Sequence, residues 1–177
     1  MNLHSLLSQH VDGLLSTAQD EATAYDEKGD VPLVGYLGSL VAYGATAAAL
    51  AAAGRNRGHA LPDSYRLVDV ALGGVATYKF TRLLSKASVT SPLRASFTTF
   101  HEAAGSAELN EEARGEGARH TVGELLTCPF CLGQWVGTGY VAALTLAPRA
   151  ARTWAAVFAV TAISDTLQHL YARVRTS

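Results

Sequence analysis

Near the start of the chain, apolar residues recur every three or four positions, which is the spacing of one helix face. They are Leu3, Leu6, Leu7, Val11, Leu14, Leu15 and Ala18. The polar positions that follow are mostly acidic as far as Asp30. The pattern predicts an acidic amphipathic helix within residues 1–30. Helices that lie in a membrane surface usually carry Lys and Arg on the polar face, so we expect this one to pack onto the rest of the fold.

Two long stretches, residues 31–54 and 125–148, contain no charged side chain. At about 1.5 Å per residue, a helix over either stretch is long enough to cross the roughly 30 Å of a hydrocarbon core. Alanine dominates the second half of the first stretch, and small residues let membrane helices approach closely. The pattern therefore predicts two spanning helices. For the first stretch, the alternative is a buried helix of an alanine-rich soluble bundle.

A further helix is predicted over residues 65–85, and its uncharged core is short. Lys79, Arg82 and Lys86 recur at intervals of three and four residues and so share one face. Long cationic side chains on such a face can reach lipid headgroups while the rest of the helix stays in the membrane. We interpret the segment as a membrane helix partly shielded by its neighbours, with an amphipathic surface helix as the alternative.

The last predicted helix covers residues 153–173 and follows a short turn that contains Pro148, which indicates an antiparallel neighbour of the preceding helix. Asp165 and His169 lie four residues apart, on one face and among apolar residues. An ionisable pair at membrane depth is a candidate functional pair. A structural hydrogen bond to another helix, or a position near the membrane interface, would place the same residues there.

Between these helices, residues 85–121 are more polar. Ser91 followed by Pro92 is typical of a helix start, with Ser91 as N-cap and Pro92 in the first turn. We expect a short amphipathic helix from there to about residue 104. The next residues are rich in Glu and Gly, and this composition predicts an exposed, mobile loop at about 105–120.

The elements together predict an all-α fold: a helical membrane protein with about four spanning or membrane-embedded helices and an N-terminal amphipathic helix. The expected domains are residues 1–30 and residues 31–177. The chain is 49% hydrophobic and 16% charged, against about 25% charged in average soluble domains. A net charge of −1 supplies no basic field for nucleic acid. We find no secretory signal peptide pattern and expect a multi-pass protein of the cell membrane, in contact with the lipid bilayer.

Which side of the membrane holds the termini stays open, because Lys and Arg are divided almost evenly between the two sets of loops. The two short loops both carry Arg, which argues for one orientation. The longer segments carry slightly more basic residues in total, which argues for the other. Neither the oligomeric state nor a partner in a membrane assembly follows from the sequence, although either is compatible with it.

The most informative stretch is residues 121–135, which contains both cysteines. Thr121 and Glu124 have the spacing of a capping box. Pro129 suits the first turn of a helix, which places Cys128 at the helix N-terminus, where the macrodipole favours a thiolate. Cys131 follows one turn later. Of the two thiols, Cys128 is therefore expected to be the more reactive.

Two glycines follow the cysteines at GxxxG spacing. Gly133 and Gly137 lie within the second uncharged stretch, and small residues at this spacing are typical of close contacts between membrane helices. We therefore expect both glycines to lie at a helix–helix contact.

Three classes of function are compatible with these residues. In a thiol–disulfide protein, Cys128 would attack and Cys131 would resolve, although no thioredoxin-like pattern of strands and helices surrounds the pair. In a metal site, Cys128 and Cys131 would combine with His120, and with His101 as a fourth ligand, to hold an ion such as zinc; a single CxxC is half of such a site. In a structural or interaction protein, the cysteines cap and pack a helix.

Three runs, in this order, resemble the bacterial domain-of-unknown-function 1360 family. They are TYKFTRLL at residues 77–84, VTSPLRASF at 89–97 and GELLTCPFCLGQW at 123–135. The resemblance extends over about residues 67–177. It implies a small multi-pass bacterial membrane protein, some relatives being linked by name to sporulation, and brings no reaction or catalytic residue with it. We therefore expect a structural or interaction component of a membrane assembly, with no cofactor assigned.

Overall fold

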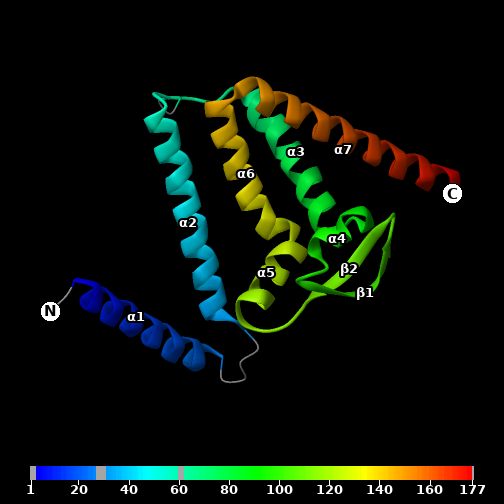
Figure 1. The fold of residues 1–177 in the computed structure, drawn as a ribbon. Helices are drawn as coiled ribbons and strands as arrows, with labels where there is room; N and C mark the ends of the chain where they lie inside the picture. The colour runs from blue at the N-terminus through cyan, green and yellow to red at the C-terminus, as the bar shows by residue number, and fades with distance from the viewer. Residues whose placement is uncertain (1–2, 27–30, 60–61, 177) are drawn as a thin grey trace. The chain divides into compact units, whose positions relative to one another are not determined.

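A computed structural model describes residues 3–26, 31–59 and 62–176 (Figure 1). The main elements in chain order are α1 (Leu3–Tyr25), α2 (Leu33–Asn56), α3 (Leu67–Lys86), α4 (Ser91–Arg94), β1 (Thr98–Gly105), β2 (Glu108–Ala113), α5 (Gly117–Thr127), α6 (Pro129–Leu146) and α7 (Pro148–Thr176). A turn of 3₁₀ helix, Ser88–Thr90, precedes α4. The protein is mostly helical, as predicted, but a two-stranded sheet interrupts the helices.

By its internal contacts the chain divides into two units, Met1–Ala42 and Tyr43–Ser177. The first holds α1 and the start of α2. Within the described parts of the chain, α2 is the one helix that is both long and apolar enough to cross a membrane. The prediction of four such helices is therefore not confirmed. Charged side chains interrupt α3 and α7, and the second uncharged stretch is divided between α5 and α6.

Within the second unit, α3 and α6 lie side by side, and the first half of α7 packs against both (Figure 1). The centre of this packing consists mainly of small residues, Ala76, Ala151 and Ala155, with Tyr140 from α6. Gly73 on α3 faces the Tyr140 ring so closely that a Cβ atom there would lie 2.0 Å from Cε1. The aromatic rings of Phe80, Trp154 and Phe158 extend the core at 4.9–5.4 Å between centroids.

One end of this bundle is fixed by an ion pair between α3 and α7. Arg152 donates from Nε to Asp69 Oδ1 at 2.9 Å and from Nη2 to Oδ2 at 2.7 Å. The hydroxyl of Tyr140 donates to the Asp69 carbonyl at 2.9 Å, so all three helices meet there. Asp69 precedes the uncharged core of α3.

The segment after α3 differs from the sequence prediction. The helix that begins at Ser91 ends at Arg94, and Thr90 rather than Ser91 precedes it as N-cap. An antiparallel hairpin of β1 and β2 follows, with a turn through residues 105–107, all of which have positive φ. The expected mobile loop at about 105–120 is therefore wrong, and so is the helix to residue 104.

Arg94 explains why this Glu-rich segment is ordered. Its side chain is 1% exposed, and each of its five N–H groups has an acceptor. The acceptors are Glu111 Oε2 at 2.6 Å, Glu111 Oε1 at 3.1 Å, the Leu84 carbonyl at 2.6 Å, Thr90 Oγ1 at 2.7 Å and the Ala87 carbonyl at 3.2 Å. The arginine thus ties β2 to the last turn of α3. The composition of the segment indicated a loop because the many acidic residues are visible in the sequence, whereas the arginines that pair with them lie elsewhere in the chain.

The second uncharged stretch is two helices rather than one. α5 begins at Gly117, within the predicted loop, and ends at Thr127. Thr121 lies inside α5 and donates to the Gly117 carbonyl at 3.2 Å, so the predicted capping box with Glu124 is wrong. The hairpin packs against α5 at Gly123, where a Cβ atom would lie 2.5 Å from the Phe97 carbonyl oxygen.

Candidate functional site

The cysteine pair lies at the junction of α5 and α6. Cys128 is the N-cap of α6, as predicted, and its sulfur accepts a hydrogen bond from the Cys131 backbone N–H at 3.1 Å. The two sulfurs are joined as a disulfide across a Cα–Cα distance of 5.3 Å. Cys131 is exposed, and the Phe130 side chain beside it is 90% exposed. The pair is therefore accessible from outside the fold.

The histidines of the metal hypothesis lie in other contacts. His120 is 3.7 Å from Glu124 on the same helix, and His101 is 3.8 Å from Glu112 on the hairpin. Over the described ranges, no group of three or more His, Cys, Asp and Glu side chains is placed to hold a metal ion. The structure thus adds no support to a zinc site at Cys128, Cys131 and His120, which stays untested.

The glycines of the GxxxG pattern have no neighbour across a helix contact. A Cβ atom built on Gly133 or Gly137 meets no atom of the described chain within 4 Å. The closest contacts between elements are instead at Gly73 and Gly123, which the sequence reasoning did not single out. Contact at Gly133 and Gly137 thus stays a prediction that would need a partner molecule.

A polar cluster that the sequence did not predict joins α2 to α6. Gln134 Nε2 donates to the Tyr43 hydroxyl at 2.7 Å, and that hydroxyl lies 2.8 Å from Thr138 Oγ1. The rings of Tyr43 and Trp135 pack edge to face at 5.4 Å. Gln134, Trp135 and Thr138 lie within about one turn of α6, so their spacing could have indicated a shared helix face. Nothing in the sequence pairs that face with Tyr43.

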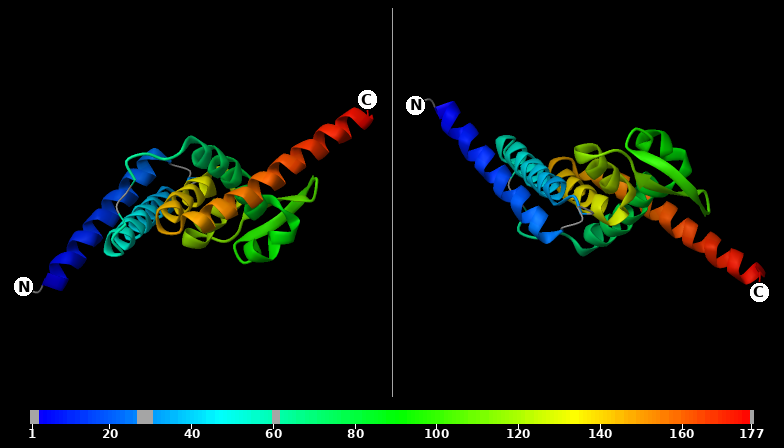
Figure 2. Two further views of the ribbon diagram at one scale, coloured as in Figure 1. Left: turned by 90° about the horizontal axis from the view of Figure 1, so that it is seen from above. Right: turned by 90° about the horizontal axis from the view of Figure 1, so that it is seen from below.

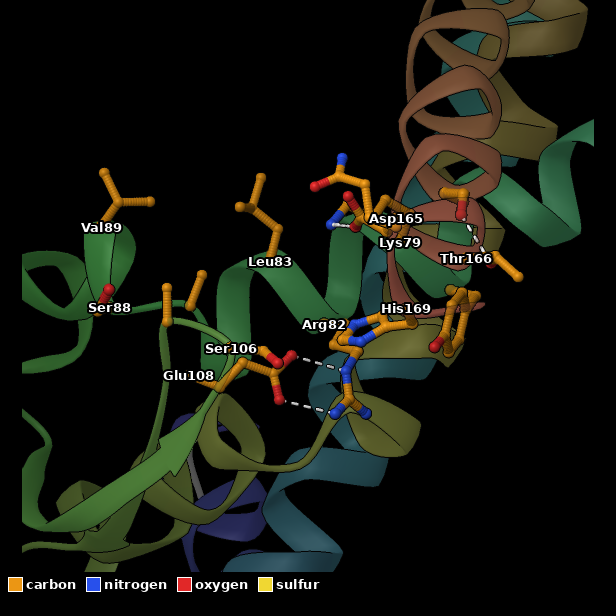
Figure 3. Close-up of a pocket in the computed structure, with 15 residues that line it drawn as sticks. Lys79, Arg82, Leu83, Ser88, Val89, Ser106, Glu108, Asp165, Thr166 and His169 are labelled. Carbon is orange, nitrogen blue, oxygen red and sulfur yellow. Dashed lines mark hydrogen bonds and ion pairs between the residues drawn. The ribbon is translucent and has the colours of Figure 1, made fainter. Parts of the chain in front are cut away.

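A cleft of about 530 Å³ lies between α3, the C-terminal half of α7 and the tip of the hairpin (Figure 3). Figure 2 shows the hairpin beside this part of α7. Arg82 on α3 donates from Nε and Nη2 to the two carboxylate oxygens of Glu108 on β2, both at 2.7 Å. Lys79, one turn earlier, pairs with Asp165 on α7. His169 lines the same cleft.

The structure brings together residues that the sequence treated separately. Lys79 and Arg82 share one face, as predicted, but both are held by carboxylates rather than extending freely. Asp165 and His169 also lie on one side of α7, and Asp165 pairs with Lys79 instead of with His169. Glu108 was missed because the sequence assigned it to a loop. No short-range pattern could have paired Glu108 with Arg82, since the two residues belong to different elements.

The cleft therefore contains two cations, each paired with a carboxylate from another element. The cysteine pair suits exchange with a thiol. Both lie in the second unit of the chain.

A curated protein and a family model are similar to this chain. The chain is 27% identical over 112 residues to the sporulation protein YjcA of Bacillus subtilis (strain 168), an alignment that covers 60% of this chain and 92% of that protein. No solved structure matches. A family model described as a protein of unknown function (DUF1360) matches residues 72–171, which hold the cleft, the Arg94 network and the cysteine pair. The chain thus belongs to the DUF1360 family.

Proposed function

We propose that the protein is a multi-pass membrane protein and a structural or interaction component of a bacterial membrane assembly. The observation that carries the proposal is the apolar outer surface of α3 and α7 in the second unit. Large apolar side chains are exposed along both helices. They are Leu67, Val68, Val70, Val75 and Tyr78 on α3, and Val157, Val160, Ile163, Leu167, Leu170, Tyr171 and Val174 on α7.

Soluble monomers rarely expose a continuous apolar surface of this kind, whereas lipid solvates it. The charged side chains of the same helices support a membrane setting, because those nearest the packing core are paired. Asp69 is bonded to Arg152, and Lys79 to Asp165. Ionisable residues within a membrane are usually paired in this way. The long apolar α2 adds a further candidate span.

The assembly role is supported by the name of the curated relative and by the chain's own chemistry. The relative is called a sporulation protein. Several charged side chains of the helices are paired across elements, Asp69 with Arg152, Lys79 with Asp165 and Arg82 with Glu108. A protein that holds others in place needs a rigid framework and an accessible surface, and α3, α6 and α7 with the exposed face of α7 provide both.

Washing of cell membranes with alkaline carbonate tests the membrane location with the full chain. We expect the protein to remain in the pellet and to require detergent for release. Release into the supernatant without detergent would contradict spanning helices and favour a soluble bundle. A known peripheral membrane protein in the same sample shows that the wash was effective.

Crosslinking in intact cells tests the assembly role. We expect the chain to form discrete crosslinked species with itself or with other membrane proteins. A chain that crosslinks to no protein, under conditions that capture a known membrane complex, would contradict this role.

A second candidate function, thiol–disulfide exchange, is favoured by the positions of Cys128 and Cys131. In the disulfide form, a partner thiolate would attack one sulfur, form a mixed disulfide and release the other as a thiolate. The second thiol of the partner would then attack the partner's own sulfur in the mixed disulfide and release the remaining cysteine of this protein as a thiol. The partner dithiol is oxidised to a disulfide, and the Cys128–Cys131 pair gains the two electrons and becomes two thiols.

Alkylation of the reduced protein tests this candidate. If Cys128 is redox-active, a Cys131→Ser variant should react rapidly with iodoacetamide and show a thiol pKa below the ordinary value of about 8.5. A Cys128→Ser variant is the matched control and should react slowly. Equal, slow reaction of both variants would leave the disulfide a structural crosslink. Protection of both thiols that a chelator relieves would favour a metal site instead.

A further inference from the structure

The two cysteines of the disulfide differ in how accessible they are. Cys131, in the first turn of α6, is exposed, whereas Cys128, at the junction with α5, is half-buried. The Phe130 side chain next to Cys131 is 90% exposed, so the rest of the fold does not cover this turn at that position. A thiolate must approach the sulfur that it attacks from the side away from the other sulfur. Access therefore favours attack at Cys131.

The two sulfurs also differ in how well each can carry negative charge. Cys128 is the N-cap of α6, and its sulfur accepts a hydrogen bond from the Cys131 backbone N–H at 3.1 Å. This bond stabilises a thiolate at Cys128 and not at Cys131, and the positive end of the helix dipole acts in the same sense at the N-cap. Disulfide exchange is faster when the departing thiolate is more stable. The leaving-group preference therefore points to Cys128.

We propose that a partner thiolate attacks Cys131 Sγ of the disulfide, and that Cys128 is the sulfur that leaves. The inference rests on thiol–disulfide exchange, the second candidate function, and assigns a role to each cysteine in it. Access and leaving-group stability agree on this assignment. It reverses the roles that the sequence suggested, in which Cys128 attacks and Cys131 resolves.

The partner must carry two thiols for the exchange to be completed. In the first step, a bond forms between the partner sulfur and Cys131 Sγ, and the Cys128–Cys131 bond breaks with its electron pair on Cys128. In the second step, the other partner thiolate attacks the partner sulfur of the mixed disulfide, and Cys131 leaves. The partner dithiol loses two electrons to the cysteine pair, and its two protons pass through solvent to Cys128 and Cys131. In the reverse direction, Cys128 closes the disulfide and expels the partner.

Mapping of the mixed disulfide in the full chain in detergent tests the assignment. The oxidised protein is mixed with glutathione and quenched with acid at short times, and free thiols are labelled with N-ethylmaleimide at mildly acidic pH. Peptide fragmentation on the N-terminal side of Pro129 separates the two cysteines for mass spectrometry. We expect at least about fivefold more glutathione on Cys131 than on Cys128, with the maleimide label in the opposite ratio.

Two single-cysteine variants measure access with the same leaving group in both. Cys128→Ser keeps only Cys131, and Cys131→Ser is the matched control that keeps only Cys128. Each remaining cysteine is converted to its mixed disulfide with 5-thio-2-nitrobenzoate, which glutathione releases as a coloured thiolate by attacking the cysteine sulfur. We expect release from Cys131 to be at least about fivefold faster. Equal rates, or faster release from Cys128, would overturn the access argument and with it the proposal.

The mapping experiment separates this inference from the candidate function on which it rests. Glutathione found mainly on Cys128, or equally on both cysteines, would overturn the assignment and keep thiol–disulfide exchange. If no mixed disulfide forms, under conditions in which glutathione opens an exposed disulfide of a control protein, both the assignment and the exchange function are overturned.

Discussion

Replacing Arg94 tests whether the hairpin depends on one buried arginine. Arg94→Met fills similar volume but removes all five donors. Glu111, whose side chain is 5% exposed, then keeps only the Thr98 hydroxyl at 3.2 Å as a side-chain partner. The carbonyls of Leu84 and Ala87 lose their donor as well. Removal of one partner from a buried ion pair destabilises proteins by roughly 3–5 kcal/mol.

Glu111→Leu and the double variant with Arg94→Met complete a double-mutant cycle that measures the interaction energy of the pair. Glu111→Leu leaves the guanidinium buried without its carboxylate, so its expected loss of unfolding free energy is also about 3–5 kcal/mol. The double variant contains no buried charge at this position and should be less destabilised than either single variant. The coupling energy from the cycle should therefore be at least about 2 kcal/mol in favour of the pair.

Thermal unfolding of the purified full chain in detergent measures these differences. For a chain of this size, each kcal/mol shifts Tm by roughly 2–4 °C, so either single variant should unfold about 6–20 °C lower. Arg82→Met is the matched control, because Arg82 is 44% exposed and its pair with Glu108 should contribute at most about 1 kcal/mol. Losses below about 1 kcal/mol at Arg94, or simple additivity in the double variant, would refute the reasoning.

Two further predictions concern the packing of the helices. Gly73→Ala should destabilise the protein by about 1–2 kcal/mol, since the clash with Tyr140 outweighs the gain in helix propensity. Gly74→Ala, where a Cβ atom meets nothing within 4 Å, should be neutral or stabilising. Asp69→Asn removes one of the two oxygens that accept from Arg152 and should lower the Tm, and an unchanged Tm would contradict the role of the pair.

The sequence predicts best what short-range patterns determine. The spacing of apolar residues indicated the helix now seen as α1, and the lack of charged residues over 31–54 indicated α2. Pro129 placed Cys128 at a helix N-terminus, because that signal also acts within one turn. The hairpin could not be predicted in this way. Its acidic residues are held by Arg82 and Arg94, which lie in earlier elements, and a window over residues 105–120 contains neither arginine.

The candidate site was only partly predictable for the same reason. Asp165 and His169 could be singled out because both are ionisable residues in an otherwise apolar stretch of helix. Their actual neighbours are set by the crossing of α3 and α7, which the sequence does not encode locally. The number of spanning helices also cannot be read from the lengths of the uncharged stretches alone, because a charged residue in a helix can be paired with a residue of another helix. Asp69 and Lys79 find partners on α7, and hydropathy treats each as an isolated charge.

The Asp69–Arg152 ion pair gives α7 a pivot. Arg152 is bonded near the start of the helix, whereas His169 lies about 25 Å further along at 1.5 Å per residue. Motion of α7 about its anchored end is therefore amplified at the cleft, where a tilt of about 5° displaces the helix by about 2 Å over that length. A tilt of α7 about Arg152 would therefore change the width of the cleft more than it changes the alanine-lined packing near that residue.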